Sequence, residues 1–222
     1  MLQQTTLKFL GDLKKNNNKE WFEKNRKVYE AAKEDFSGLV QNVIDRFAKK
    51  DETIATLKAK DCVFRINRDV RFSKDKSPYK SNMGASFGKG GKKSMLAGYY
   101  FHCEPGNSFV GGGLWNPEAE KIKKVRQEID YNFDEFKKIF KGKKFIREYG
   151  GLNKNAETSL SREPKGYEKD NPAIDYIKLK SWVAMKPLAD ADLRNKDLVN
   201  TIVASFDALK PVIDFLNRGL EN

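Results

Sequence analysis

The sequence predicts an α+β protein: an antiparallel sheet with helices packed on one face, in a single domain over residues 1–222. Three observations predict this. Apolar residues recur at helical spacing from Asn17 to Phe47, the period falls to two between residues 62 and 116, and helical segments return after Pro117. Because helices and strands occupy separate stretches instead of alternating, a parallel sheet with crossover helices is not expected. A chain of 222 residues can bury a core without disulfide or metal staples.

The longest predicted helix covers residues 18–50. Asn17, followed three residues later by Glu20, resembles a capping box that would start it. Asn25 falls on the apolar stripe, where a buried amide needs hydrogen-bond partners. We expect it to make a polar contact near a helix end, with a role in a site as the alternative. The stripe itself consists of Phe22, Tyr29, Ala32, Phe36, Leu39, Val43 and Phe47.

Three segments between residues 62 and 116 are expected to be strands. "YKSNMGASF" and "GYYFHCE" alternate apolar and polar residues, which is typical of half-buried antiparallel strands. "GKGGKK" between them predicts a hairpin turn, and it lacks the register of a nucleotide-binding P-loop. "NSFVGGGLW" predicts a further strand, in which the glycines permit a bulge or a close approach of backbones.

The remaining chain is expected to be mainly helical. A helical stretch runs from Pro117 to about Lys141 with a boundary near Asp130, and "NPAIDYIK" predicts a short helix. "SWVAMKPL" predicts another strand. Residues 195–219 form the closing helix, which Pro211 should kink or divide because proline has no backbone N–H to donate.

Composition narrows the class of protein. The net charge of +12 and a pI near 9.5 favour polyanionic partners. Cys62 and Cys103 are too few for a disulfide framework, and no Cys/His cluster has zinc-ligand spacing, so we expect no metal site and a reduced, cytoplasmic chain. Residues 1–15 predict a short amphipathic helix, not a signal peptide, and no apolar run is long enough for a membrane span.

Residues 64–80, "FRINRDVRFSKDKSPYK", hold three arginines and three lysines against two aspartates. A continuous strand here would bury Arg68 beside Ile66 and Val70, which is costly unless a carboxylate or a bound anion pairs with it. A turn at residues 67–69 would place Arg68 at the tip instead. Both alternatives bring arginines together. The turn would leave one apolar face made of Phe64, Ile66, Val70 and Phe72.

These residues suggest a pocket for a small phosphate- or carboxylate-bearing ligand, because arginine binds such groups through two parallel hydrogen bonds. If the ligand is turned over, Asp69 or Glu104 would act as a base and His102 as an acid. His102 is the only histidine, so it cannot complete a common zinc site. Cys103 should face the core. The ligand-binding candidates are Arg65, Arg68, Arg71, Lys74, Lys76, Lys80 and Tyr100, with Arg162 and Lys165 from a later loop.

Two other classes of function stay open. A nucleic-acid-binding module would explain the net charge and the basic residues interleaved with Phe72, Tyr79 and Tyr100, although no signature of the common folds is present. A structural or partner-binding protein would instead use the same clusters as internal salt bridges. The sequence names no reaction, no cofactor and no oligomeric state.

Five linked segments carry a resemblance to a known family. They are "NNNKEWFEKNRKVYE", "FRINRDVRFSKDKSPYK", "GYYFHCEPG", "GGGLWNP" and "REPKGYEKDNP". Together they resemble a bacterial and fungal family, domain of unknown function family 2461, over about residues 5–219. The resemblance implies that these segments belong to one domain, and it brings no activity, substrate or cofactor. It also implies a histidine where Asn171 stands, so a mechanism that needs that histidine is not expected here.

Overall fold

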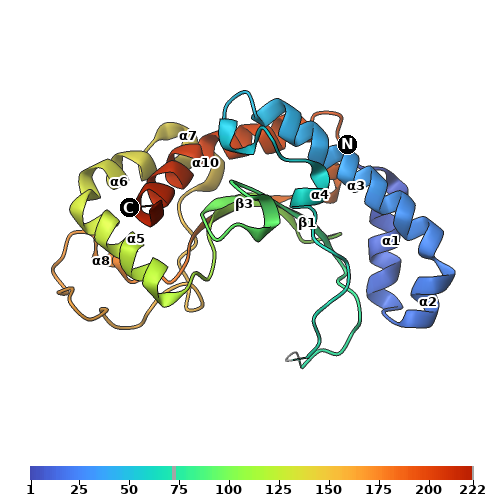
Figure 1. The fold of residues 1–222 in the computed structure, drawn as a ribbon, viewed down its shortest axis with the longest axis horizontal. Coiled ribbons are helices and arrows are strands. Elements are labelled where there is room, and N and C mark those ends of the chain that lie inside the picture. Colours follow the sequence, from blue (N-terminus) through green and yellow to red (C-terminus); the bar gives the residue numbers. More distant parts are fainter. Residues whose placement is uncertain (72–73, 222) are drawn as a thin grey trace. The chain divides into compact units, whose positions relative to one another are not determined.

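The computed structural model describes residues 1–71 and 74–221 and confirms the α+β class. Phe72, which the alternation placed on an apolar face, lies outside the described residues. Antiparallel strands form one sheet in the order β1-β2-β3-β4 (Figure 1). The strands are β1 (Met83–Phe87), β2 (Gly98–Cys103), β3 (Ser108–Leu114) and β4 (Trp182–Leu188).

The chain divides into two compact units. That residues 1–222 form one domain therefore stays a prediction. The first unit comprises Met1–Lys92, Tyr100–Val110 and Pro187–Ala204, and the second comprises Lys93–Tyr99, Gly111–Lys186 and Ser205–Asn222.

The long helix expected over residues 18–50 is interrupted at Asn25. This residue ends α2 (Lys19–Lys24) and precedes α3 (Arg26–Phe47), and its Nδ2 donates to the Trp21 carbonyl at 2.9 Å. The predicted polar contact near a helix end is thus confirmed. The chain before it forms α1 (Gln4–Lys15), the expected N-terminal helix.

The predicted capping box at Asn17 is wrong by one residue. Asn18 caps α2, because its side chain accepts a hydrogen bond from the Trp21 N–H at 2.9 Å. Asn17 instead exchanges two hydrogen bonds with the Tyr79 backbone, donating to its carbonyl at 2.9 Å and accepting from its N–H at 3.1 Å. An amide side chain can imitate a backbone partner in this way, and here it ties the N-terminal helices to the segment before β1.

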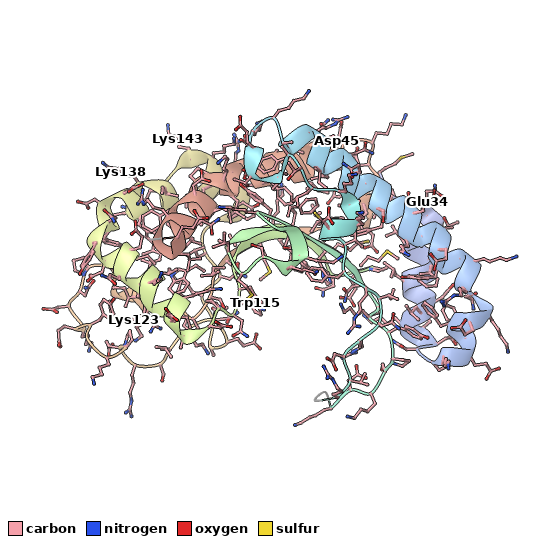
Figure 2. The ribbon with its side chains drawn as sticks, viewed as in Figure 1. Glu34, Asp45, Trp115, Lys123, Lys138 and Lys143 are labelled. Carbon is pink, nitrogen blue, oxygen red and sulfur yellow. The ribbon has the colours of Figure 1, made fainter. Side chains whose placement is uncertain are left out.

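In the first unit, α3 packs its apolar stripe on the sheet. Phe36 stacks on Phe101 of β2 with ring centroids 5.8 Å apart and planes 12° from parallel. Along β2, Phe101 and Cys103 are buried whereas Tyr100 and His102 are half-buried, which is the predicted alternation. The opposite side of α3 is polar and exposed, as the labelled Glu34 and Asp45 show in Figure 2. Two short helices, η1 (Glu52–Ile54) and α4 (Ala59–Cys62), follow α3.

Neither a continuous strand nor a turn at residues 67–69 describes the basic segment. Two isolated antiparallel bridges are formed here: Val63, just before the segment, bridges Ala85 of β1, and Asn67 bridges Tyr79 within the segment. Between the two bridges, residues 64–66 on one side face the longer stretch 80–84 on the other, so the pairing is interrupted there. The connecting loop is longer than a tight turn, and Phe64 and Ile66 do not share a buried face, because they are 36% and 4% exposed.

The second unit contains most of the later helices. They are α5 (Ala119–Tyr131), α6 (Phe133–Phe140), α7 (Lys143–Tyr149) and α8 (Ile174–Ile177), and the chain continues through α9 (Asp190–Leu193) into α10 (Leu198–Glu221). Pro211 was predicted to kink or divide the closing helix. It does not divide it, since α10 continues through Pro211, and a kink stays a prediction. Leu209, Val212 and Phe215 are all buried, and this packing offsets the lost backbone hydrogen bond.

The glycine run in β3 allows neighbouring backbones to approach closely, as predicted. A Cβ at Gly113 would lie 2.0 Å from the Trp182 carbonyl oxygen, and one at Gly111 would lie 2.2 Å from that of Ala184. Gly113 also has a φ of 125°, which side-chain-bearing residues rarely adopt. Directly after the strand, Trp115 is 63% exposed (Figure 2).

Candidate anion-binding pocket

A cavity of about 390 Å³ lies in the first unit between α3, α4, residues 63–66 and the start of β1. Three kinds of side chain meet there: cations, neutral hydrogen-bonding groups, and apolar or aromatic groups. The cations are Lys33, Lys60, Arg65 and Lys92; the neutral polar groups are Ser37, Asn82 and the Tyr29 hydroxyl; the apolar groups are Val63, Phe64, Ile66 and Met83.

Helix α3 supplies one wall of the cavity. Tyr29, Lys33 and Ser37 are spaced four residues apart, so they form one stripe along the helix. One turn further on, the Gln41 side chain accepts a hydrogen bond from the Ala59 N–H at 2.9 Å, which ties α4 to this end of the stripe. The order of residues along α3 therefore sets the order of groups along the cavity wall.

The positive charge of the cavity has little internal compensation. Lys92 Nζ donates to the backbone carbonyls of Lys60 at 2.5 Å and Val63 at 2.9 Å, and these groups carry no net charge. Lys33 lies 3.3 Å from Glu30, in a pair whose side chains are both 52% exposed. No acidic side chain lines the cavity, and the side chains of Lys60 and Arg65 form no ion pair within residues 1–71 and 74–221.

Two other arginines of residues 64–80 form ion pairs within that segment. Arg68 forms an ion pair with Asp75, one of the partners that the buried-strand reasoning required. Arg71 donates twice to Asp69, at 2.9 and 2.6 Å, and these bonds lower the pKa of the Asp69 carboxyl. Neither arginine lines the cavity. An aspartate held ionised by an arginine is a poor candidate for a general base near neutral pH. In the same loop, Lys76 Nζ donates to the Val70 carbonyl at 3.0 Å.

The pKa of Lys80 reflects both its burial and the positive charges around it. Its pKa is lowered by burial and then by the neighbouring charges of Arg65 and Arg68. Its Nζ lies 5.5 Å from the centre of the Phe64 ring, a cation–π distance. Nearby positive charges disfavour the protonated form of a lysine, and a bound anion would favour it.

A hydrogen-bonded row is formed by Tyr100 and His102, on the half-buried face of β2, and by Glu104, directly after the strand. The Tyr100 hydroxyl lies 3.3 Å from His102 Nδ1, and His102 Nε2 lies 3.4 Å from a Glu104 carboxylate oxygen. The His102 ring stacks on Phe109 with centroids 4.8 Å apart. None of the three lines the cavity, but the Tyr100 ring is 6.3 Å from that of Phe64, which does.

The electrostatics of this row favour a neutral imidazole beside an ionised carboxylate. Burial lowers the pKa of His102, although Glu104 acts in the opposite direction. Burial would raise the pKa of Glu104, but hydrogen bonds outweigh it and the pKa is lowered. A tyrosine hydroxyl donating to Nδ1, with Nε2–H donating to the carboxylate, satisfies all three groups. Glu104 also accepts hydrogen bonds from Lys14, Ser81 and Asn107.

The two later candidates, Arg162 and Lys165, are exposed and belong to the second unit. That they complete the same pocket stays a prediction. Asn171, in the same motif, has a structural role: its side chain donates to Asp130 at 2.7 Å and accepts from the Ala173 N–H at 2.7 Å. These bonds hold the chain at the start of α8.

Sequence reasoning missed Lys33, Lys60 and Lys92 as pocket residues. Each is a single lysine far along the chain from Arg65, and lysines are common on any solvated surface. The one available signal was the four-residue spacing of Tyr29, Lys33 and Ser37 on a helix that was already predicted.

Metal and thiol chemistry have little support in the described structure. Among residues 1–71 and 74–221, no three His, Cys, Asp or Glu side chains gather in a group that could hold a metal ion. Cys62 and Cys103 are free and buried, and burial raises their pKa values to about 11 and about 12. Both thiols are therefore protonated at neutral pH and unreactive. None of the helices in the described part of the chain combines the length and apolarity needed to cross a bilayer.

A family model matches residues 5–215, almost the whole chain, and the chain belongs to that family, described as conserved hypothetical protein (DUF2461). The resemblance carried by the five segments is thereby confirmed. No curated protein and no solved structure matches the chain significantly.

Proposed function

We propose that this protein binds a small phosphate- or carboxylate-bearing ligand in the cavity between α3, α4 and residues 63–66. One observation carries the proposal: four cations line a single cavity of about 390 Å³ that contains no carboxylate. Lys33 pairs with Glu30, which does not line the cavity, and no carboxylate lies among the four cations inside it. Like charges gathered in this way raise each other's energy, and a bound anion would lower it. The volume suits a small organic molecule.

Each cation would contribute differently to the ligand. Arg65 offers a planar fork that matches two oxygens of a phosphate or carboxylate, whereas the three lysines act as point charges. Ser37 and Asn82 can add hydrogen bonds that orient the bound group. Because Lys33, Lys60 and Arg65 are exposed to solvent, the affinity should fall as salt is added. The proposal concerns binding and assigns no reaction.

The test is titration calorimetry of the protein with inorganic phosphate at low ionic strength, on the parent and on Arg65→Gln. We expect the substitution to weaken binding by about tenfold or more, because a charge-assisted bidentate contact is lost. The matched control is Arg147→Gln, which removes an exposed arginine of α7 without touching the cavity and should leave affinity unchanged.

Two outcomes would favour the other classes of function. Tight binding of unrelated oligonucleotides near physiological ionic strength, with a steep salt dependence, would indicate a nucleic-acid-binding module. If phosphate does not bind the parent and Arg65→Gln only changes its melting temperature, the cavity cations are structural and the proposal is wrong.

A further inference from the structure

The cavity has two chemically different ends. Tyr29 and Ser37 lie eight residues apart on the α3 stripe, a rise of about 12 Å at 1.5 Å per residue. That length exceeds the size of a phosphate or carboxylate group. What lines each end therefore indicates what the remainder of a ligand should be.

The end near Ser37 is cationic. The Gln41–Ala59 hydrogen bond brings α4, and with it Lys60, to this end of α3. Lys92 joins it, since its Nζ donates to the carbonyls of Lys60 and Val63. An anionic group placed here would meet two ammonium groups that have no carboxylate partner in the cavity.

The end near Tyr29 is aromatic and apolar. The centroid of the Tyr29 ring lies 5.0 Å from that of Phe22 and 5.9 Å from that of Phe9. The Phe22 ring stacks on Tyr79 with centroids 3.9 Å apart. Because Asn67 is bridged to Tyr79, residues 63–67 run from the cationic end towards this aromatic cluster.

The wall between the two ends is largely apolar. Phe64, Ile66 and Met83 line it, together with the Arg65 guanidinium. Lys33 Nζ lies 5.9 Å from the centre of the Tyr29 ring, so this cation borders the aromatic end. An inorganic ion would leave these apolar surfaces in contact with water, whereas a ligand with a ring would cover them.

We infer that the ligand is an aryl compound carrying one phosphate or carboxylate, with the anion at Lys60, Lys92 and Arg65 and the ring against Tyr29 and Ile66. This inference rests on the proposed anion-binding function. It adds the class of ligand: both ends of the cavity should contribute to the affinity, so an aryl anion should bind more tightly than a bare anion, which the proposed pocket already binds, and more tightly than a bare ring. Aromatic rings pack on one another in offset or tilted arrangements, and the half-buried Tyr29 ring could pack on a ligand ring in this way.

The experiment compares matched pairs of probes by titration calorimetry at low ionic strength. Phenyl phosphate is compared with methyl phosphate, and benzoate with acetate, so that the ring is tested separately from the type of anion. We expect each aryl probe to bind roughly tenfold more tightly than its methyl partner, because covering the apolar wall adds to the ionic contact. The stronger of the two aryl probes identifies the anionic group.

Variants assign the preference to the two ends. Tyr29→Leu should remove most of the advantage of phenyl phosphate and leave methyl phosphate binding unchanged. Lys60→Gln should weaken both probes by a similar factor. Tyr131→Leu is the control, because Tyr131 is 74% exposed and does not line the cavity. Tyr29 also packs in the N-terminal aromatic cluster, so Phe64→Leu, at a 36% exposed cavity residue, repeats the test should Tyr29→Leu not fold.

The outcomes separate this inference from the proposed function. Equal affinity for aryl and methyl probes, with both weakened by Lys60→Gln, would overturn the aryl ligand and leave the anion pocket standing. An aryl preference that survives both Tyr29→Leu and Phe64→Leu would also overturn it, since the ring would then bind elsewhere. Failure of all four probes to bind would overturn both proposals.

Discussion

Arg218 in the second unit and Arg65 in the first are surrounded very differently. Arg218 donates from Nε to Glu128 at 2.9 Å and holds Glu135 with two further bonds, at 3.0 and 2.7 Å. Hydrogen bonds from Arg218 to these two carboxylates raise its pKa, and the guanidinium also lies 5.0 Å from the Phe215 ring. Arg65 has no ion-pair partner within residues 1–71 and 74–221, and the other charged residues that line the cavity are three lysines.

The difference separates two uses of positive charge. In a chain with a net charge of +12, a cation clamped by acids joins elements of the fold, as Arg218 joins α10 to α5 and α6. A cluster without acids adds repulsion to the folded state. The pKa of Lys80, outside the cavity, is lowered first by burial and then by the charges of Arg65 and Arg68. The first kind of site should appear in stability measurements and the second in ligand binding.

The largest expected effect comes from giving the cavity the carboxylate that it lacks. Asn82→Asp preserves the shape of a half-buried cavity side chain and adds one negative charge. We expect the affinity for phosphate to fall by about ten- to a hundredfold, because the new carboxylate competes for the same cations and repels the ligand. Titration calorimetry measures the change, and the melting temperature should stay level or rise.

Asn42→Asp is the matched control for this experiment. It makes the same chemical change on the exposed side of α3, outside the cavity. A similar loss of affinity in both variants would mean that net charge alone attracts the anion, and the contrast between Arg65 and Arg218 would then have no bearing on binding.

The next largest effect concerns Arg218, which is ion-paired with Glu128 and Glu135. Arg218→Gln should lower the free energy of unfolding by about 1–2 kcal/mol, since a partly exposed network contributes modestly but Glu128 is left with few partners. The Glu128 side chain is only 13% exposed, so solvent can replace the lost contact only in part. Urea unfolding measures this change, and phosphate affinity should not move. An Arg218→Gln variant as stable as the parent, or one that binds phosphate less tightly, would contradict the structural role.

The sequence predicted the fold well where periodicity is local. The strands β1 and β2 follow from two-residue alternation. The segment of β3 was predicted as a further strand, and its glycines mark the close approach to β4. Two local predictions failed, one of them in part, because competing contacts are not local. Asn17 is drawn to the Tyr79 backbone 62 residues away, and Pro211 stays helical because buried neighbours hold α10 in place.

The candidate site was predicted only in part. Of the basic residues between 64 and 80, Arg65 lines the cavity, whereas Arg68 and Arg71 pair with Asp75 and Asp69. Composition cannot distinguish an arginine that lines the cavity from one that forms an ion pair, because it counts cations and acids without showing which acids lie close to which cations. The lysines of the cavity come from three other elements, and only the folded chain brings them to Arg65.

The smallest expected effect concerns His102, and it again compares a cation that has an acidic partner with one that does not. Burial and the Glu104 carboxylate shift the pKa of His102 in opposite directions. Burial is the larger influence and lowers the pKa of His102 in the folded state, while the neighbouring Glu104 acts to raise it. A depressed folded pKa means that the unfolded chain takes up a proton first as the pH falls below the ordinary histidine value of about 6.5. Stability is therefore full above that pH and is lost as the pH falls towards the folded pKa. The Tyr100 hydroxyl and the ionised Glu104 are the titratable groups that contact the ring, and Lys14 contacts Glu104.

Because His102 is the only histidine, its titration can be followed without ambiguity. Urea unfolding of the parent at pH 7.5 and pH 5.5 should show a small loss of stability at the lower pH, and the imidazole proton resonance should give a pKa below the ordinary value. His102→Gln keeps an amide that can bond Tyr100 and Glu104 but does not titrate, so its unfolding free energy should change less over this range. A parent that becomes more stable at pH 5.5 would show that the Glu104 carboxylate outweighs burial. His102 would then be a cation with a partner, of the same kind as Arg218.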